Sequence, residues 1–99
     1  MKINKTVNGT ELVIALNGRL DTNTAPMLDT ELSSSLPGMT SLIIDMKELE
    51  YISSAGLRVL LSAHKTMSKQ GKMVVKNCSD DVMDIFDVTG FTDILTIEK

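Results

Sequence analysis

The sequence predicts an α/β fold: a mixed β-sheet with an N-terminal antiparallel hairpin and otherwise parallel strands, flanked by helices. Short apolar runs rich in β-branched residues alternate along the chain with longer segments whose apolar residues recur at helical spacing. Strands separated by helices need crossover connections, and these join parallel strands. Asn8-Gly9, between the first two strands, is typical of a tight hairpin turn.

The hairpin is predicted to pair two short strands. Residues alternate in character over Ile3–Val7, and Asn8-Gly9 then supplies residues that readily adopt positive φ angles. The second strand, Leu12–Leu16, is apolar on both faces, which places it in the interior of the sheet. We expect the chain to leave this strand over residues 17–21.

The first helix is predicted to follow Thr22-Asn23-Thr24, which offers three N-cap candidates before Ala25-Pro26. Proline costs little at a helix start, because the first N–H groups lack partners inside the helix. Pro37-Gly38 ends the segment. One face carries the apolar residues Ala25, Leu28, Leu32 and Leu36.

The next strand and helix enclose a pair of serines. Ser41–Met46 is too short and too rich in β-branched residues for a helix, so it predicts a buried parallel strand. A helix is expected from Ser53-Ser54 to about Gln70, with Gly71 placed to end it. Its apolar stripe comprises Val59, Leu60, Ala63 and Met67, widened by Leu57, Leu61 and His64.

The last third of the chain predicts a strand, a short helix and a closing segment. Lys72–Lys76 is the strand, and Ser79-Asp80-Asp81 caps a helix that runs to Val88. Ile94–Ile97 is a candidate final strand. The inward residues of the short helix are Val82, Ile85 and Phe86.

Composition limits the classes of protein to which the chain can belong. A chain of 99 residues is sized for a single domain, which we expect to span 1–99. Its net charge of -3 argues against direct nucleic-acid binding. Cys78 is the sole cysteine, and no apolar run approaches the roughly 20 residues that span a bilayer. We therefore expect a cytoplasmic protein that does not insert into membranes.

Residues with catalytic or metal-binding potential are few. His64, the one histidine, lies in mid-helix without an orienting partner, and Cys78 has no evident activating base. One histidine and one cysteine cannot supply a typical tetrahedral zinc site, and the chain has no glycine-rich phosphate loop. We expect no enzyme activity, no catalytic residue, no metal site and no cofactor.

The serine pair allows two interpretations. One serine can cap the helix by accepting a hydrogen bond from its first turn. The other hydroxyl then lies at the carboxyl end of a parallel strand, where ligands of open α/β sheets usually bind and where free N–H groups favour a phosphate. The residues alone favour a cap function and leave the phosphate function open.

The chain resembles the bacterial anti-sigma factor antagonists, which are stand-alone STAS domains. Three segments in the family's usual order carry the resemblance, and with the hairpin before them they cover nearly the whole chain. They are LNGRLDTNTAP at 16–26, LIIDMKELEYISSAGLRVLL at 42–61 and IFDVTGFTDIL at 85–95. The resemblance implies a STAS-like mixed sheet, which agrees with the fold expected from periodicity.

The resemblance also implies a phosphoacceptor. In phosphorylated members the acceptor serine follows the acidic residue of a D-S-[ST]-G motif, which assigns the acceptor to Ser54. Ser53 stands at the acidic position and is the runner-up acceptor. The family segment beside the acceptor corresponds to the loop after the second strand. The implied partner-binding residues are Asp21, Thr22, Asn23, Ser53, Ala55, Gly56 and Leu57.

The partners implied by the resemblance are a serine kinase that is also the anti-sigma factor, and a metal-dependent serine phosphatase. The unmodified antagonist binds the kinase and frees the sigma factor, and phosphorylation dislodges it. Two other functions remain open: a non-phosphorylated adaptor, such as the STAS subunit of a lipid transporter, and a sensor that binds a nucleotide or another small molecule.

Overall fold

The structure, a computed structural model, describes residues 1–98 and contains one five-stranded sheet with the strand order β1-β2-β3-β4-β5. β1 and β2 pair antiparallel, and every later pair is parallel. The predicted mixed sheet is confirmed. The elements are β1 (Lys2–Asn8), β2 (Glu11–Leu20), α1 (Ala25–Ser35), β3 (Ser41–Ile52), α2 (Ser54–Ser68), β4 (Lys72–Lys76), α3 (Asp80–Thr89), the short 3₁₀ helix η1 (Phe91–Asp93) and β5 (Thr96–Glu98).

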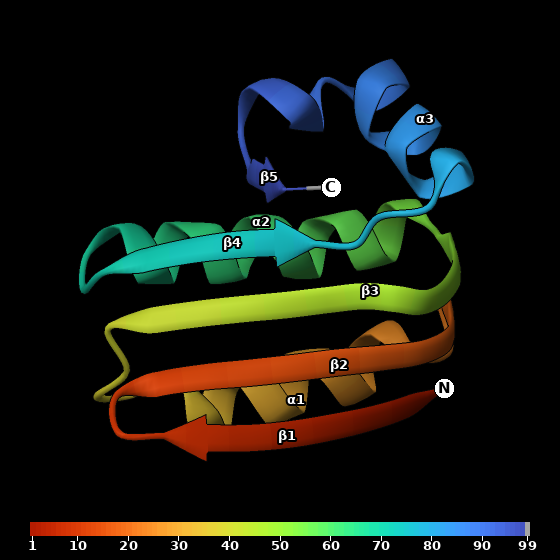
Figure 1. Cartoon of the computed structure of the whole chain (residues 1–99). Helices are drawn as coiled ribbons and strands as arrows, with labels where there is room; N and C mark the ends of the chain where they lie inside the picture. Colours follow the sequence, from red (N-terminus) through yellow and green to blue (C-terminus); the bar gives the residue numbers. More distant parts are fainter. Residues whose placement is uncertain (99) are drawn as a thin grey trace.

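The main core lies between the sheet and helices α1 and α2, which cover the same face (Figure 1). Alternate residues of the central strands are fully buried there, whereas Val13, Ala15 and Ile43 on the opposite face are only half-buried. β2 is interior to the sheet, as predicted, but it is completely buried on one face only. The buried residues of β2 and β3 are Leu12, Ile14, Leu16, Leu20, Leu42, Ile44, Met46, Leu49 and Ile52.

Both central strands are longer than predicted, because β2 continues past Leu16 and β3 past Met46. The pairing of β2 with β3 shifts register twice, between Ala15 and Asn17 and between Gly18 and Arg19. Gly18 has a φ of 106°, which other residues rarely adopt. Such irregularities break the two-residue alternation that identifies a strand in a sequence. These extensions carry the strands to the edge where the site lies.

The hairpin turn differs from the predicted Asn8-Gly9 pair. Asn8 is still paired with Glu11, so the two turn residues are Gly9 and Thr10. Gly9 has a φ of 65°, whereas Asn8 has no positive φ. The asparagine therefore belongs to the strand.

α2 ends at Ser68, slightly before the predicted end at Gln70, and Gly71 has a different function from the one expected. A left-handed glycine commonly terminates a helix, but Gly71 has no positive φ. A Cβ atom there would instead overlap the carbonyl group of Thr40. That carbonyl also accepts a hydrogen bond from the amide of Lys72 at 3.1 Å. Gly71 thus allows two connections of the sheet to approach closely.

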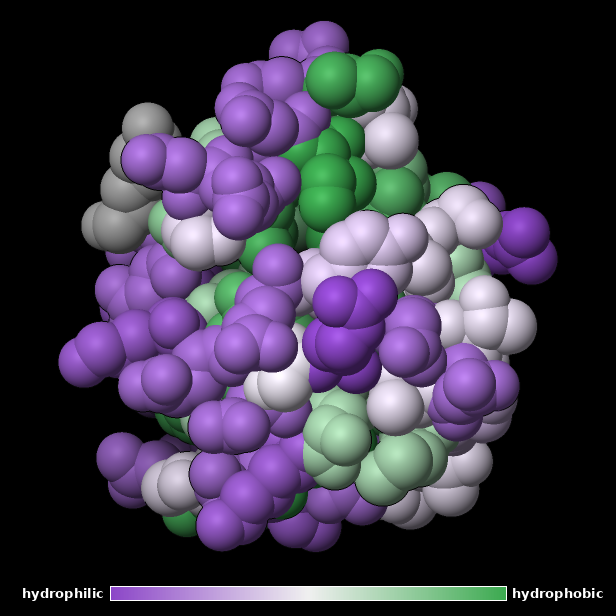
Figure 2. Space-filling view, turned by 90° about the vertical axis from the view of Figure 1, so that its right-hand side faces the viewer, coloured by the Kyte–Doolittle hydropathy of each residue, from purple (hydrophilic) through white to green (hydrophobic). Residues whose placement is uncertain are grey.

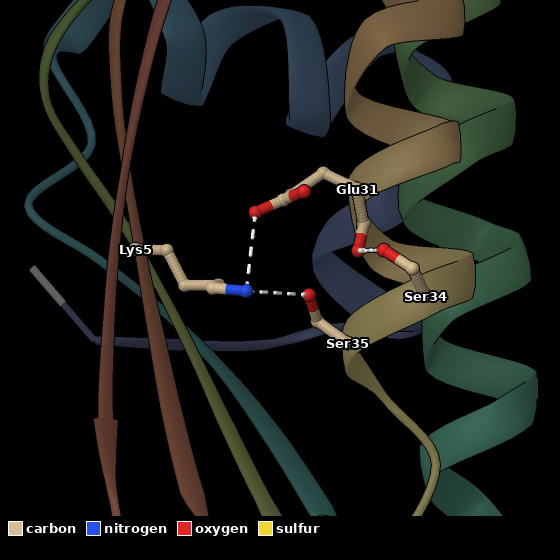
Figure 3. Close-up of polar contacts among 4 residues, drawn as sticks. All are labelled: Lys5, Glu31, Ser34 and Ser35. Atoms are coloured by element: carbon tan, nitrogen blue, oxygen red, sulfur yellow. Dashed lines mark hydrogen bonds and ion pairs between the residues drawn. The ribbon is translucent and has the colours of Figure 1, made fainter.

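A polar contact links the edge strand β1 to helix α1 (Figure 3). The Lys5 Nζ atom lies 3.7 Å from the Glu31 carboxylate and 3.4 Å from the Ser35 hydroxyl oxygen. The ion pair is partly exposed, so it stabilises the fold by at most about 1 kcal/mol.

The last helix begins where predicted and ends one residue later. The Ser79 hydroxyl accepts a hydrogen bond from the Val82 amide at 3.2 Å, and left-handed Gly90 follows Thr89. Of the predicted inward residues, Val82 and Phe86 are buried and Ile85 is half-buried. η1 was not predicted, and the final strand is Thr96–Glu98 rather than Ile94–Ile97.

Candidate functional site

The carboxyl ends of β2 and β3 meet at one edge of the sheet, and there the loop before α1 lies next to the start of α2. The amide of Ser53 donates to the carbonyl oxygen of Leu20 at 2.8 Å and joins the two segments. Figure 2 looks onto this edge: hydrophobic side chains gather over α3 at the top, and hydrophilic ones cover most of the left side. The loop and the first turn of α2 are therefore held side by side at this edge.

The two serines have different positions at the start of α2. Ser53 is the N-cap: its hydroxyl oxygen accepts from the Gly56 amide at 3.3 Å, and its carbonyl oxygen accepts from the Leu57 amide at 2.9 Å. Ser54 is the first helical residue and is exposed. Within residues 1–98 its hydroxyl takes part in no side-chain hydrogen bond. The cap function therefore belongs to Ser53 and leaves Ser54 free.

Gly56 and Leu57 lie beneath the surface on which Ser54 is exposed. Gly56 is buried, and a Cβ atom on it would lie 2.7 Å from the Leu20 Cγ atom and 3.0 Å from the Ile52 Cγ1 atom. The glycine thus allows α2 to pack closely on the ends of β2 and β3. Leu57 is 5% exposed and belongs to the core. Neither residue offers a partner much area, whereas Ala55 is half-buried.

The loop after β2 is held by Asp21. Its Oδ1 atom accepts hydrogen bonds from the amides of Asn23 at 3.0 Å and Thr24 at 3.1 Å. The hydrogen bond from the Thr24 amide is the main cause that lowers the pKa of the Asp21 carboxyl below 3.8. Thr24, the N-cap of α1, turns its hydroxyl back to the carbonyl oxygen of Arg19 at 2.7 Å and makes no side-chain cap bond. Thr22 and Asn23 are exposed at the tip of the loop.

Two further residues of this edge, Arg19 and Tyr51, were not predicted. They face each other across β2 and β3, and the Arg19 guanidinium carbon lies 4.4 Å from the centre of the Tyr51 ring. The predicted strands ended at Leu16 and Met46, so no register was predicted from which to pair these side chains. The signal in the sequence that could have found them was an arginine and a tyrosine inside the quoted motifs.

The remaining candidates lie elsewhere. Burial raises the pKa of the half-buried Cys78 thiol to about 11, which keeps it protonated at neutral pH. His64 lines a small cavity of about 200 Å³ with Ser68 and Lys72, among other residues. Among residues 1–98, no three His, Cys, Asp or Glu side chains converge on a metal site, and no helix is long and apolar enough to cross a membrane.

A second cavity, of about 360 Å³, lies between α1 and α2. It is lined by residues of both helices, among them Asp29 of α1 and Val59 of α2, and by Pro37 and Gln70, which follow the ends of these helices. It is therefore displaced from the first turn of α2. Neither this cavity nor the one beside His64 is lined by Ser53 or Ser54.

Comparison with known proteins gives the family. Residues 2–99 match the family model of the STAS domain. The anti-sigma-B factor antagonist of Bacillus subtilis is 34% identical over 100 residues, which cover 98% of this chain and 92% of that protein.

Solved structures agree with the fold. The anti-sigma factor antagonist SpoIIAA in its unphosphorylated form superimposes with a TM-score of 0.77 at 18% identity, covering 99% of this chain and 88% of the other. The phosphorylated form of SpoIIAA from Bacillus gives 0.76 at 19% identity, covering 99% and 92%. With its sheet topology, its family match and a relative of nearly the same length, the chain belongs to the STAS domain family, in the branch of the anti-sigma factor antagonists.

Proposed function

We propose that this chain is an anti-sigma factor antagonist controlled by phosphorylation of Ser54. In its unmodified form it binds an anti-sigma factor that is also a serine kinase, and so frees a sigma factor. The exposed Ser54 hydroxyl, one residue past the cap of α2, is the observation that carries the proposal. The names of the relatives support the antagonist function.

The geometry of α2 favours Ser54 over Ser53 as the phosphoacceptor. The half-buried Ser53 hydroxyl already accepts the Gly56 amide, so it is less accessible to a kinase than the exposed Ser54 hydroxyl. At Ser54 a phosphate lies on the first helical turn, where N–H groups have no partner inside the helix and the helix dipole favours negative charge. The modified side chain is thus compatible with the fold.

The partner surface that we propose combines the exposed groups around this hydroxyl. Ala55 and Ser53 belong to it on the α2 side, and Asp21, Thr22 and Asn23 on the loop side. The 2.8 Å hydrogen bond between the Ser53 amide and the Leu20 carbonyl oxygen supports a fixed spacing between the two sides. Gly56 and Leu57 contribute by holding α2 in place beneath them.

A phosphate at the centre of this surface is sufficient for a switch. Phosphoserine carries about -1.5 to -2 charge at neutral pH, and a buried interface must desolvate or repel that charge. A loss of about 3 kcal/mol lowers affinity roughly a hundredfold. SpoIIAA matches this chain equally well in both phosphorylation states, which supports a switch without refolding. A metal-dependent serine phosphatase would then restore the binding form.

Reaction with candidate kinases tests the acceptor. The anti-sigma serine kinases of the source organism are purified and incubated with the chain and ATP, and the products are mapped by mass spectrometry. We expect phosphate on Ser54 and none on a Ser54→Ala variant. Phosphate on Ser53 alone would assign the acceptor to Ser53 instead. If no kinase phosphorylates the chain, the adaptor or sensor function is favoured.

Affinity for the unmodified kinase tests the switch. Ser54→Ala removes only the hydroxyl, so we expect it to bind as the wild type does. Ser54→Asp adds a charge that the interface must bury, so its affinity should fall at least tenfold, less than with phosphate because Asp carries less charge. Calorimetry measures both. Equal affinities of two folded variants would place Ser54 outside the interface.

A further inference from the structure

The only tyrosine of the chain lies at the site edge rather than in the core. Tyr51 is 37% exposed, whereas the two phenylalanines stack on each other with ring centres 6.5 Å apart and one of them, Phe86, is fully buried. Tyr51 follows Glu50 and precedes Ile52, whose side chain enters the core beneath Gly56. A large aromatic ring is thus presented to solvent two residues before the N-cap of α2.

Arg19 contacts that ring. Its guanidinium carbon lies 4.4 Å from the ring centre, within the range of a cation–π contact. Such a contact needs no hydrogen-bond acceptor, and a guanidinium carries five N–H donors. Among residues 1–98 the side chain of Arg19 forms no ion pair and donates no hydrogen bond to another side chain or to the backbone.

Asp21, two positions along the chain, forms no ion pair with this arginine within residues 1–98. The Arg19 charge is one of the causes that lower the pKa of Asp21, but the Asp21 Oδ1 atom is bonded to the amides of Asn23 and Thr24. Asp21 is therefore engaged in its own loop. The arginine therefore remains an exposed cation that forms no ion pair within residues 1–98.

We propose that the Arg19–Tyr51 pair is the anchor of the partner surface, and that Arg19 binds a carboxylate of the anti-sigma partner. The inference rests on the proposed function, since it concerns the same interface. A guanidinium can present two parallel N–H donors, the geometry that a carboxylate accepts. Arginine and tyrosine are also the residue types that most often dominate binding energy at interfaces.

Calorimetry with the kinase that binds the wild-type chain tests the pair. Arg19→Ala should lower affinity at least tenfold. Arg19→Lys should lower it nearly as much, because lysine lacks the planar guanidinium with its two parallel N–H donors. Tyr51→Leu should weaken binding severalfold, and Tyr51→Phe should have no effect because it keeps the ring. Lys69→Ala, which removes a positive charge from the far end of α2, is the matched control and should bind within twofold of the wild type.

The pair should also behave as one unit. The double variant Arg19→Ala/Tyr51→Leu should lose little more affinity than Arg19→Ala alone, because the tyrosine acts by positioning the arginine. Circular dichroism verifies that each variant is folded. If Arg19→Ala is not folded, Arg19→Lys takes its place in the affinity measurement.

Three results would contradict the proposals, and each has a different meaning. If the wild type binds a kinase but Arg19→Ala and Arg19→Lys bind equally well, the anchor is wrong while the proposed function stands. If the Arg19 variants lose affinity only when the kinase holds ADP, the anion that Arg19 binds is a nucleotide phosphate. The assignment of a partner carboxylate is then wrong. If the wild type binds no kinase, both proposals fail.

Discussion

The Ser53 hydroxyl oxygen lies 3.3 Å from the Gly56 amide nitrogen, whereas the hydroxyl of the next residue faces solvent at the first turn of α2. A difference of one position thus separates a residue that stabilises the helix from one that is available for modification. The Gly56 amide is one of the helix donors that would otherwise lack a partner. The two serines should therefore respond differently to the same substitution.

Alanine substitution at each serine measures this difference. Ser53→Ala removes the cap and should lower the free energy of unfolding by about 1 kcal/mol. Ser54→Ala removes a free hydroxyl and should change it by less than about 0.5 kcal/mol. Urea unfolding followed by circular dichroism gives both values, and Ser53→Asn, which retains a capping oxygen, is the control. A larger loss at Ser54 would mean that Ser54 is the N-cap in solution.

Asp21 gives a pH-dependent test of the loop beside the serines. The hydrogen bond from the Thr24 amide lowers the pKa of its carboxyl below 3.8, so the ionised form stabilises the native state. That stabilisation is complete above about pH 4 and is lost as the pH falls through the lowered folded-state pKa. Asp21→Asn should be less stable than the wild type at pH 6, and the difference should shrink below pH 3.8.

Denaturant midpoints of the two proteins, measured from pH 2.5 to 6, test this expectation. Asp29→Asn, which removes a carboxylate from an exposed helix position, is the control and should change the midpoint at pH 6 by less than Asp21→Asn does. A constant difference between the wild type and Asp21→Asn over the whole range would show that the carboxylate is not what holds the loop.

At the scale of elements, the sequence allowed prediction wherever local chemistry decides the structure. The strand Lys72–Lys76 and the cap at Ser79 agree with the structure to the residue, because an apolar run between turn residues and a capping serine are local signals. The extensions of β2 to Leu20 and β3 to Ile52 depend on register shifts between the strands, which no single strand encodes. The Arg19–Tyr51 pair was inaccessible for the same reason.

The connection between α2 and β4 shows another limit of local patterns. A glycine after a helix predicts a left-handed C-cap, but Gly71 is needed because the Thr40 carbonyl, thirty-one positions away in the sequence, occupies the space of a side chain. The requirement comes from the pairing of β3 with β4, which starts at Ser41 and Lys72. Only the assembled sheet shows it.

Gly71→Ala should therefore be among the more damaging small substitutions of the chain. The added methyl group meets backbone rather than a flexible side chain, so the connection must shift and the free energy of unfolding should fall by about 3 kcal/mol. Lys69→Ala, two residues earlier at an exposed position, should change it by less than about 0.5 kcal/mol. Thermal or urea unfolding distinguishes them. Equal stabilities would mean that the connection adapts without cost.

At the scale of the whole molecule, the elements that carry the proposed switch are held in place by the core. The first turn of α2 rests through Gly56 and Leu57 on the ends of β2 and β3, and α1 and α2 share the core face of the sheet (Figure 1). A close-packed interior leaves little free volume into which these elements could rearrange. A phosphate on Ser54 should thus act through its own charge and hydration rather than through a change of fold.

Amide chemical shifts of the phosphorylated and unmodified chains test the rigid switch. Changes should be confined to the sheet edge, namely residues 19–24 and 50–58, while amides of the Gly9 turn and of the Gly71 connection at the opposite end should not shift. Phosphate at the positive end of α2 should leave the melting temperature unchanged or raise it by a few degrees, because it complements the helix dipole. Ser54→Ala, treated with kinase and ATP in parallel, is the control. Shifts spread across the sheet, or a lower melting temperature, would mean that phosphorylation acts by loosening the domain, and the charge-based account of the switch would then be wrong.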